Sequence, residues 1–208
     1  MRASDCGSYL LPPGHPHAAT AAIDRLPEAT EISHDMPSMS ALIVPVPAAE
    51  QLVGSWRWQL DRAARWGIPA HITLVYPFAP PETIDTGVVS RLRALFAGTE
   101  PFAFSLMEPR RFGDQVLYLA PSTDQPFRRL TGIIVREFPE YPPYGGAFRE
   151  VIPHLTIADG AALEEMAAAE AEVAPNLPIR SSVDEVWLMS GGTEEGSWTV
   201  VERFALGT

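Results

Sequence analysis

The chain has 208 residues, of which 46% are hydrophobic and 20% are charged, and its formal net charge at pH 7 is −11. This composition is typical of a globular protein with a sizeable buried core and argues against a fibrous or wholly disordered chain. The acidic balance disfavours a broad surface for long nucleic acids, because such surfaces need many Lys and Arg side chains.

The sequence shows no pattern of membrane insertion or export. No run approaches the roughly 20 apolar residues of a transmembrane helix, and the N-terminus lacks a basic segment followed by a long apolar run. The one cysteine, Cys6, can form no disulfide within the chain, which fits a reducing compartment. We therefore expect a cytoplasmic protein that does not contact membranes.

Residues 1–38 differ in character from the rest of the chain. They contain Pro, Ala, Ser and His without a sustained period of 2 or 3.6 residues, which is typical of a disordered tail. We therefore expect a tail at 1–38 and one folded domain, built from two lobes, at 39–208.

Alternating strand and helix patterns begin near Met39. A strand at 41–46 is followed by a helix that starts at Pro47 and ends at Gly67, and an apolar strand follows at 68–78. The next helix carries an apolar stripe on one side, formed by Val88, Val89, Leu92, Leu95 and Phe96.

The middle of the chain predicts a hairpin and a third helix. Strands at 102–107 and 115–120 are joined by the turn RRFGD, which contains Arg110 and Arg111. The third helix has its stripe at Phe127, Leu130, Ile133, Ile134 and Phe138. The loop at 139–150 is rich in Pro and Gly, and loops of this length are often functional.

The C-terminal part predicts three strands and one helix. A strand at 151–158 precedes a helix at 162–174, and two strands at 183–190 and 197–205 end the chain. We expect the helix stripe at Leu163, Met166, Ala167, Ala171 and Ala174. The order of elements indicates an α+β or mixed α/β fold with two similar halves.

Two of the strands carry the same short motif. IPAHITLVYPF at 68–78 and VIPHLTIA at 151–158 each contain a His, an apolar residue, a Thr and an aliphatic residue. Side chains alternate between the faces of a strand, so His71 projects with Thr73, and His154 projects with Thr156. Repetition in the two halves indicates that both pairs line one cleft.

Two imidazoles and two hydroxyls in one cleft suit the cleavage of a phosphodiester. An imidazole, with an ordinary pKa of about 6.5, acts as base or acid near neutral pH. One histidine would take a proton from the attacking oxygen while the other gives a proton to the leaving oxygen, and the Thr hydroxyls would bind phosphate oxygens. A zinc site usually needs three or four ligands, so we expect no metal.

The paired His-x-Thr strands resemble the 2H phosphoesterase superfamily, which includes the 2′,5′-RNA ligase-like proteins and cyclic phosphodiesterases. The resemblance covers about 39–208 and implies a bilobal α+β fold, with two mainly antiparallel sheets around a central cleft and helices outside. It further implies metal-independent chemistry on 2′,3′-cyclic or 2′-5′-linked phosphodiesters, and we expect hydrolysis of a 2′,3′-cyclic phosphate or a related small nucleotide phosphodiester, without a cofactor. His71 and His154 would be the acid-base pair, and Thr73 and Thr156 would bind the phosphate.

Three further residues are candidates for substrate binding. Tyr76 and Phe78 either stack on a nucleobase or belong to the core. Arg149, just before the second motif, either binds phosphate or is solvated. Asp159 stands where many relatives that act on RNA have a basic residue, and its carboxylate would repel a polyanion.

Other functions stay open at this stage. The first is RNA 2′-5′ ligation or RNA-end processing, the second is a non-catalytic nucleotide-binding module, and the third is a structural interaction domain. We expect the partner to be a small phosphorylated nucleotide or an RNA end, and we expect the chain to be a monomer.

Overall fold

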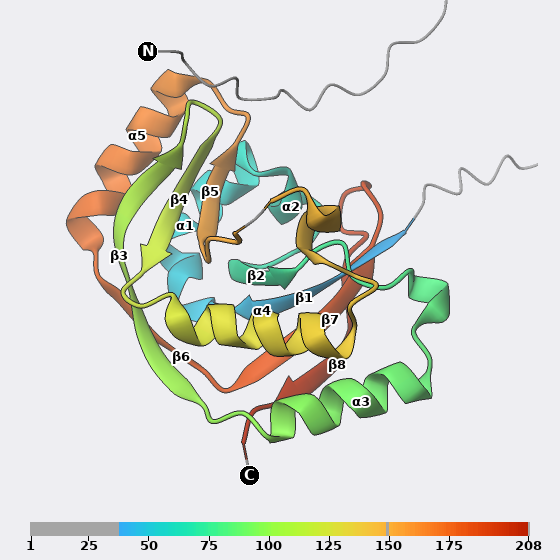
Figure 1. Ribbon diagram of the computed structural model, residues 1–208. Coiled ribbons are helices and arrows are strands. Elements are labelled where there is room, and N and C mark those ends of the chain that lie inside the picture. The colour runs from blue at the N-terminus through green and yellow to red at the C-terminus, as the bar shows by residue number, and fades with distance from the viewer. Residues whose placement is uncertain (1–37, 149, 208) are drawn as a thin grey trace, which may run out of the picture. The chain divides into compact units, whose positions relative to one another are not determined.

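Two four-stranded sheets organise residues 38–148 and 150–207, which are the residues that the computed structural model describes (Figure 1). The order is β2-β1-β7-β8 in the first sheet and β5-β4-β3-β6 in the second, and every pair of neighbours is antiparallel. The predicted α+β class with two antiparallel sheets is confirmed. The predicted tail, except for Ser38, lies outside the described residues.

The strands have the following bounds. The first sheet contains β1 (Met39–Pro45), β2 (His71–Val75), β7 (Glu185–Gly191) and β8 (Thr199–Ala205). The second sheet contains β3 (Phe102–Phe112), β4 (Val116–Pro121), β5 (Leu155–Asp159) and β6 (Ile179–Val183).

Helices connect and flank the sheets. They are α1 (Pro47–Leu60), α2 (Arg62–Arg65), α3 (Thr86–Ala97), α4 (Gln125–Glu137) and α5 (Leu163–Val173). Three 3₁₀ turns are η1 (Pro81–Thr83), η2 (Pro143–Gly146) and η3 (Ala174–Asn176). In Figure 1, α5 flanks the second sheet and α3 lies beside β8.

The two faces of β1 serve different purposes. Leu42 and Val44 are fully buried in a main core that both sheets and α4 share. Ala41 and Ile43 point to the opposite face, because side chains alternate along a strand, and they belong to a smaller apolar cluster with Trp198. The first sheet therefore has one face in the core and one face that can line a cavity.

The predicted helix from Pro47 to Gly67 is wrong in one respect, because it breaks at Asp61 into α1 and α2. Asp61 has extended backbone angles. Its carboxylate accepts a hydrogen bond of 3.0 Å from the N–H of Ala63 and so caps α2. The chain turns sharply at Gly67, whose φ of +100° favours glycine.

The predicted hairpin turn at Arg110 and Arg111 is also wrong, because β3 continues to Phe112. Both arginines pair with β4. Their guanidinium groups bind carboxylates, Arg110 to Glu108 at 2.5 Å and Arg111 to Glu170 at 2.7 Å. Both guanidinium groups are therefore bound to carboxylates, and neither is among the residues that line the cavity with the motif histidines.

Three features of the C-terminal part differ from the prediction. The second motif strand begins at Leu155, because Pro153 cannot donate to a strand ladder. The strand β6 was not predicted, since its alternating exposed positions pair only with β3 at a sheet edge. In α5 the buried residues are Met166, Ala169 and Val173, whereas Leu163 is 49% exposed.

Candidate active site

The two motif segments meet at the edges of the two sheets. β2 is the edge strand of the first sheet and β5 is the edge strand of the second, and the two strands lie in contact. In each segment the apolar neighbours of the motif residues are buried, namely Ile72 and Leu74 in one and Leu155 and Ile157 in the other. The polar residues consequently face away from the core.

A cavity of about 350 Å³ lies between the segments, and all four motif residues line it. His71, Thr73, His154 and Thr156 are each half-buried. The structure therefore brings together the two His-Thr pairs that the sequence analysis expected to share one cleft.

Both imidazoles are held in the same way. Nδ1 of His71 lies 2.7 Å from the carbonyl oxygen of Pro69, and Nδ1 of His154 lies 2.6 Å from the carbonyl oxygen of Ile152. A carbonyl only accepts, so Nδ1 must carry the proton in both rings. Nε2 is then the nitrogen left to act as an acceptor in the neutral imidazole.

Aromatic rings fix the orientation of the second imidazole. The ring of His154 packs edge-on against Phe112 at 5.0 Å and against Tyr118 at 5.2 Å. The first imidazole is instead held by Thr73, whose hydroxyl oxygen lies 3.2 Å from Nε2 of His71. Each histidine therefore has a second contact besides its carbonyl partner.

Burial keeps both imidazoles neutral. Desolvation lowers the pKa of His71 from 6.5 to about 3, and the charge of Arg57 lowers it further, against the opposing hydrogen bond to Pro69. Burial also lowers the pKa of His154, against its hydrogen bond to Ile152. Near neutral pH, both Nε2 atoms can therefore accept a proton.

One buried ion pair next to the cavity was not predicted from the sequence. Arg57 of α1 is 1% exposed and binds Asp61, which lines the cavity, with Nη2 2.9 Å from the carboxylate. The sequence does contain a pattern that indicates this pair. Arg57 follows the buried Val53 by four residues on α1, and Asp61 follows Arg57 by four, which is the spacing of side chains that meet on one helix face. Apolar residue type and spacing predict that Trp56 belongs to the buried stripe. In the structure Trp56 is only partly buried, and Arg57 is one of the fully buried residues of α1.

Aromatic side chains form one wall of the cavity. Trp66, Tyr76, Tyr144 and Trp198 line it, and the rings of Tyr76 and Trp198 lie 6.2 Å apart. Tyr144 comes from η2, within the loop that the sequence analysis marked as often functional, and its N–H donates to the carbonyl of Tyr76 at 2.6 Å. Planar aromatic faces of this kind can stack on a base or sugar.

The charges at the cavity rim are mixed. Arg62 and Asp159 both line the cavity and form an exposed ion pair with 3.5 Å between Nη2 and Oδ2. Asp61 adds a third charged group, although burial raises the pKa of its carboxyl. The cavity rim is therefore not the strongly basic surface that binding of a long polyanion would require.

The three further candidates have different positions. Tyr76 lines the cavity. Phe78 is only 4% exposed and packs against Phe138 and Tyr141 at 5.3 Å, so it belongs to the core and not to the cavity wall. Arg149 lies outside the described residues.

A second cavity of about 440 Å³ adjoins the first one. The two share Val116, Tyr144 and His154, and the rest of the second cavity is mostly apolar, with Phe112, Phe148, Val151 and Ile152. His154 thus lines both cavities.

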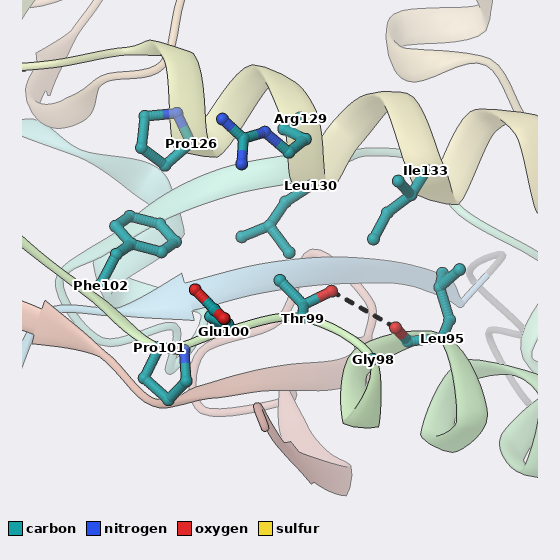
Figure 2. A pocket seen from close by; sticks show the side chains of 10 residues that line it. All are labelled: Leu95, Gly98, Thr99, Glu100, Pro101, Phe102, Pro126, Arg129, Leu130 and Ile133. Atoms are coloured by element: carbon teal, nitrogen blue, oxygen red, sulfur yellow. Dashed lines mark hydrogen bonds between the residues drawn. The ribbon is translucent and has the colours of Figure 1, made fainter. Parts of the chain in front are cut away.

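A larger cavity lies elsewhere and carries no motif residue. Figure 2 shows this space of about 520 Å³ between α3 and α4, with Arg129 and Leu130 on one side and Thr99, Glu100 and Pro101 on the other. Arg129 and Glu100 are exposed. No histidine lines this cavity, so its size alone does not make it the reactive site.

Two features are absent from the described residues. Within residues 38–148 and 150–207, no group of three or more His, Cys, Asp or Glu side chains is arranged to hold a metal ion. In the same part of the chain, no helix is long and apolar enough to cross a membrane.

Comparisons with known proteins agree with this geometry. The model of the 2′-5′ RNA ligase superfamily matches residues 44–195. A Staphylococcus aureus protein (strain Newman) named "Putative phosphoesterase" is 25% identical over 171 residues, which are 79% of this chain and 96% of the relative.

Solved structures show the same fold. Escherichia coli LigT complexed with NADP+ superposes with a TM-score of 0.55 at 18% identity and covers 84% of this chain and 100% of LigT. The LigT complex with 3′-AMP gives a TM-score of 0.51 at 17% identity, covering 83% and 99%. The protein TT0787 of Thermus thermophilus gives 0.56 at 17% identity, covering 81% and 97%.

Proposed function

The chain belongs to the 2′-5′ RNA ligase superfamily, and we propose from this premise that it is a metal-independent phosphodiesterase that hydrolyses 2′,3′-cyclic phosphates or related small nucleotide phosphodiesters. The resemblance that the paired motifs suggested is confirmed by the family match. In this proposal the catalytic domain spans 39–208, the tail at 1–38 takes no part in the chemistry, and the enzyme works as a monomer without a cofactor.

One observation carries the proposal most directly. Two imidazoles line one cavity, and in each of them Nδ1 carries the proton that binds a carbonyl two residues earlier, which leaves Nε2 as the unprotonated nitrogen of the neutral ring. A phosphodiester cleavage needs one group that accepts a proton and one that donates a proton. Two Nε2 nitrogens in one cavity can supply both roles without a metal.

We assign the base to His71 and the acid to His154. The pKa of His71 is lowered by burial and by the charge of Arg57, whereas that of His154 is lowered by burial without this charge. The charge of Arg57 therefore opposes a second positive charge on the ring of His71. An anionic phosphate bound between the rings favours the protonated form of both, and at His154 the charge of Arg57 is not among the causes that oppose it.

The reaction balances with these two residues. His71 Nε2 takes a proton from water as the water oxygen forms a bond to phosphorus. The bond from phosphorus to the 2′- or 3′-oxygen breaks, and protonated His154 gives its proton to that leaving oxygen. The product is a phosphomonoester with one free hydroxyl, and exchange with solvent restores both histidines. Thr73 and Thr156 would donate hydrogen bonds to the non-bridging oxygens.

The size and walls of the cavity support a small nucleotide substrate. Its volume of about 350 Å³ lies within the usual range of small-molecule sites, and Tyr76 and Trp198 offer aromatic faces for a base. The structural neighbour LigT has been solved with 3′-AMP and with NADP+, both of them small nucleotides. Phe78 is not part of this proposal, because it is buried in the core.

A second candidate is 2′-5′ ligation or processing of RNA ends, which the description of the family favours. The net charge of −11 and the carboxylate of Asp159 at the rim stand against a long RNA substrate. Ligation would use the same two histidines in the reverse direction. Binding of RNA that weakens steeply with added salt would support this candidate.

The test is hydrolysis of a panel of 2′,3′-cyclic nucleotides in excess chelator by the wild type, His71→Ala and His154→Ala, with His34→Ala as a control outside both motifs. Each motif variant should lose about 10² to 10⁴-fold in kcat, and the double variant should lose far less than the product. Full activity in either motif variant would refute the histidine pair. Nucleotide binding without turnover in the wild type would favour a binding module.

A further inference from the structure

Arg57 is a charged side chain that is almost fully buried behind the candidate active site. It is 1% exposed and lies on α1 in a stripe with Ala49, Val53 and Leu60. A buried guanidinium is unfavourable unless its donors find partners. The identity of those partners therefore shows what the side chain is built to hold.

The guanidinium contacts both motif segments at once. Nη1 and Nη2 each lie 3.3 Å from the carbonyl oxygen of Ile68, three residues before His71. Nε lies 3.1 Å from the carbonyl oxygen of Thr156, two residues after His154. Asp61 accepts from Nε at 3.2 Å and from Nη2 at 2.9 Å, which fixes the plane of the guanidinium.

Strand pairing does not set the distance between the motifs. In the described part of the chain β2 pairs with β1 and β5 pairs with β4, and the two edge strands share no ladder. Of the hydrogen bonds recorded for these residues, those of Arg57 join both motif segments to a single group. The planar fork of an arginine suits this task, because its donors keep fixed directions.

A purely stabilising role is a weak explanation. Replacing a buried ion pair by apolar side chains of similar volume is often neutral or stabilising, and α1 is already buried on both sides of Arg57 through Val53 and Leu60. The hydrogen bonds from the Arg57 guanidinium to the carbonyls of Ile68 and Thr156 explain better why a charged residue occupies this position.

We propose that Arg57 is a positioning residue, whose guanidinium holds the carbonyls of Ile68 and Thr156 and thereby sets the separation and orientation of the His71 and His154 imidazoles. This inference rests on the proposed function for its kinetic test and on the structure alone for its spectroscopic test.

The charge of Arg57 has a second effect, on the titration of His71. After burial, Arg57 is the largest cause that lowers the pKa of His71, and His154 adds a smaller contribution. The other titratable or charged groups around the cavity are Asp61, Arg62, Tyr76, Tyr144 and Asp159. Removal of the guanidinium should therefore raise the pKa of His71.

Two substitutions separate charge from geometry. Arg57→Lys keeps the positive charge but loses the fork, and Arg57→Met loses both. Arg93→Met is the control, because Arg93 is exposed on α3 and pairs with Glu202 away from the cavity. All variants are assayed on the 2′,3′-cyclic nucleotide panel well below their own melting temperatures.

Both Arg57 variants should lose about 10²-fold in kcat, since a misplacement of about 1 Å can cost that much, while KM changes by less than about threefold. In Arg57→Met the acidic limb of the pH profile should also move to higher pH, whereas in Arg57→Lys it should stay. A kcat within about threefold of wild type in both variants, with only a lower melting temperature, would overturn the proposal.

A second measurement keeps the inference testable if Arg57→Met does not fold or if the wild type shows no turnover. NMR spectra of the imidazole nitrogens in wild type, Arg57→Lys and Asp61→Asn report the two rings directly. Displaced resonances of both His71 and His154 in these variants support the proposal. Unchanged resonances of both rings overturn it, whatever the outcome for the proposed function.

Discussion

The Nε2 atom of His71 lies 3.2 Å from the hydroxyl oxygen of Thr73. Nδ1 of the same ring donates to Pro69, so without substrate the neutral Nε2 accepts the hydroxyl proton of Thr73, and this hydroxyl has to turn towards the phosphate when substrate binds. The second motif is different, because no hydrogen bond recorded within the described residues joins His154 to Thr156. The two threonines are equivalent in sequence and not in contacts.

This difference predicts unequal effects of the two threonines. Thr73→Val and Thr156→Val should each raise KM by about tenfold, because each removes one hydrogen bond to a charged phosphate. Only Thr73→Val should also raise the pKa of His71, since it removes a bond to the neutral ring. Steady-state kinetics and NMR titration measure both effects, with Thr73→Ser and Thr156→Ser as controls that keep the hydroxyl. Equal pKa changes in the two Val variants would contradict the assignment.

The buried imidazoles should make the free energy of unfolding depend on pH. The pKa of His71 is about 3 in the folded state against 6.5 for an ordinary histidine, so the unfolded state binds more protons between these values. Stability must then rise with pH across this window and fall as pH is lowered from about 6.5 towards 3, by up to about 1.4 kcal/mol per pH unit for this group.

Urea denaturation at a series of pH values measures this effect, and the difference between wild type and His71→Gln isolates it from the carboxylates. His71→Gln should show a shallower fall in stability below pH 6.5. Parallel curves for the two proteins would mean that the imidazole of His71 is not desolvated in the folded state.

Much of the fold and of the candidate site followed from local patterns. Two-residue alternation placed His71 with Thr73 and His154 with Thr156, and repetition placed the pairs in one cavity. These inferences succeeded because the motif residues interrupt otherwise apolar strands, which makes their polar face visible in the sequence.

The parts that local patterns missed depend on tertiary contacts. Arg57 is buried because Asp61 and two backbone carbonyls from distant segments receive its donors, and no local pattern encodes those carbonyls. Phe78 comes three residues after the end of β2 at Val75, and it turns into the core against Phe138. Tyr144 reaches the cavity only because its loop folds back onto Tyr76.

The rim carboxylate of Asp159 should limit binding of longer anionic substrates. Asp159→Asn removes a negative charge and frees Arg62 from its ion pair at 3.5 Å. A charge pair about 4 Å apart in water is worth about 1 kcal/mol, so KM for an oligonucleotide with a 2′,3′-cyclic end should fall by up to about fivefold. KM for a cyclic mononucleotide should change less. The decrease in KM for the oligonucleotide should vanish at high salt, where exposed charges are screened. A decrease that persists at high salt would contradict this explanation.

Tyr144 combines a role in the cavity wall with an unfavourable backbone conformation. Its φ is +53°, and Gly145 and Gly146 after it also have positive φ, at +62° and +78°. Of these three residues Tyr144 is the one with a side chain, and a left-handed conformation costs such a residue roughly 1 to 2 kcal/mol. We infer that this cost is retained because the ring lines both cavities next to His154.

Two substitutions at Tyr144 separate the ring from the backbone. Tyr144→Ala removes the ring and keeps the strain, whereas Tyr144→Gly removes both. The Gly variant should unfold with a free energy about 1 kcal/mol higher than the Ala variant in urea denaturation, while both should raise KM for cyclic nucleotides to the same extent. An Ala variant at least as stable as the Gly variant would show that the backbone is not strained here. A KM unchanged in both would show that the ring does not contact the substrate.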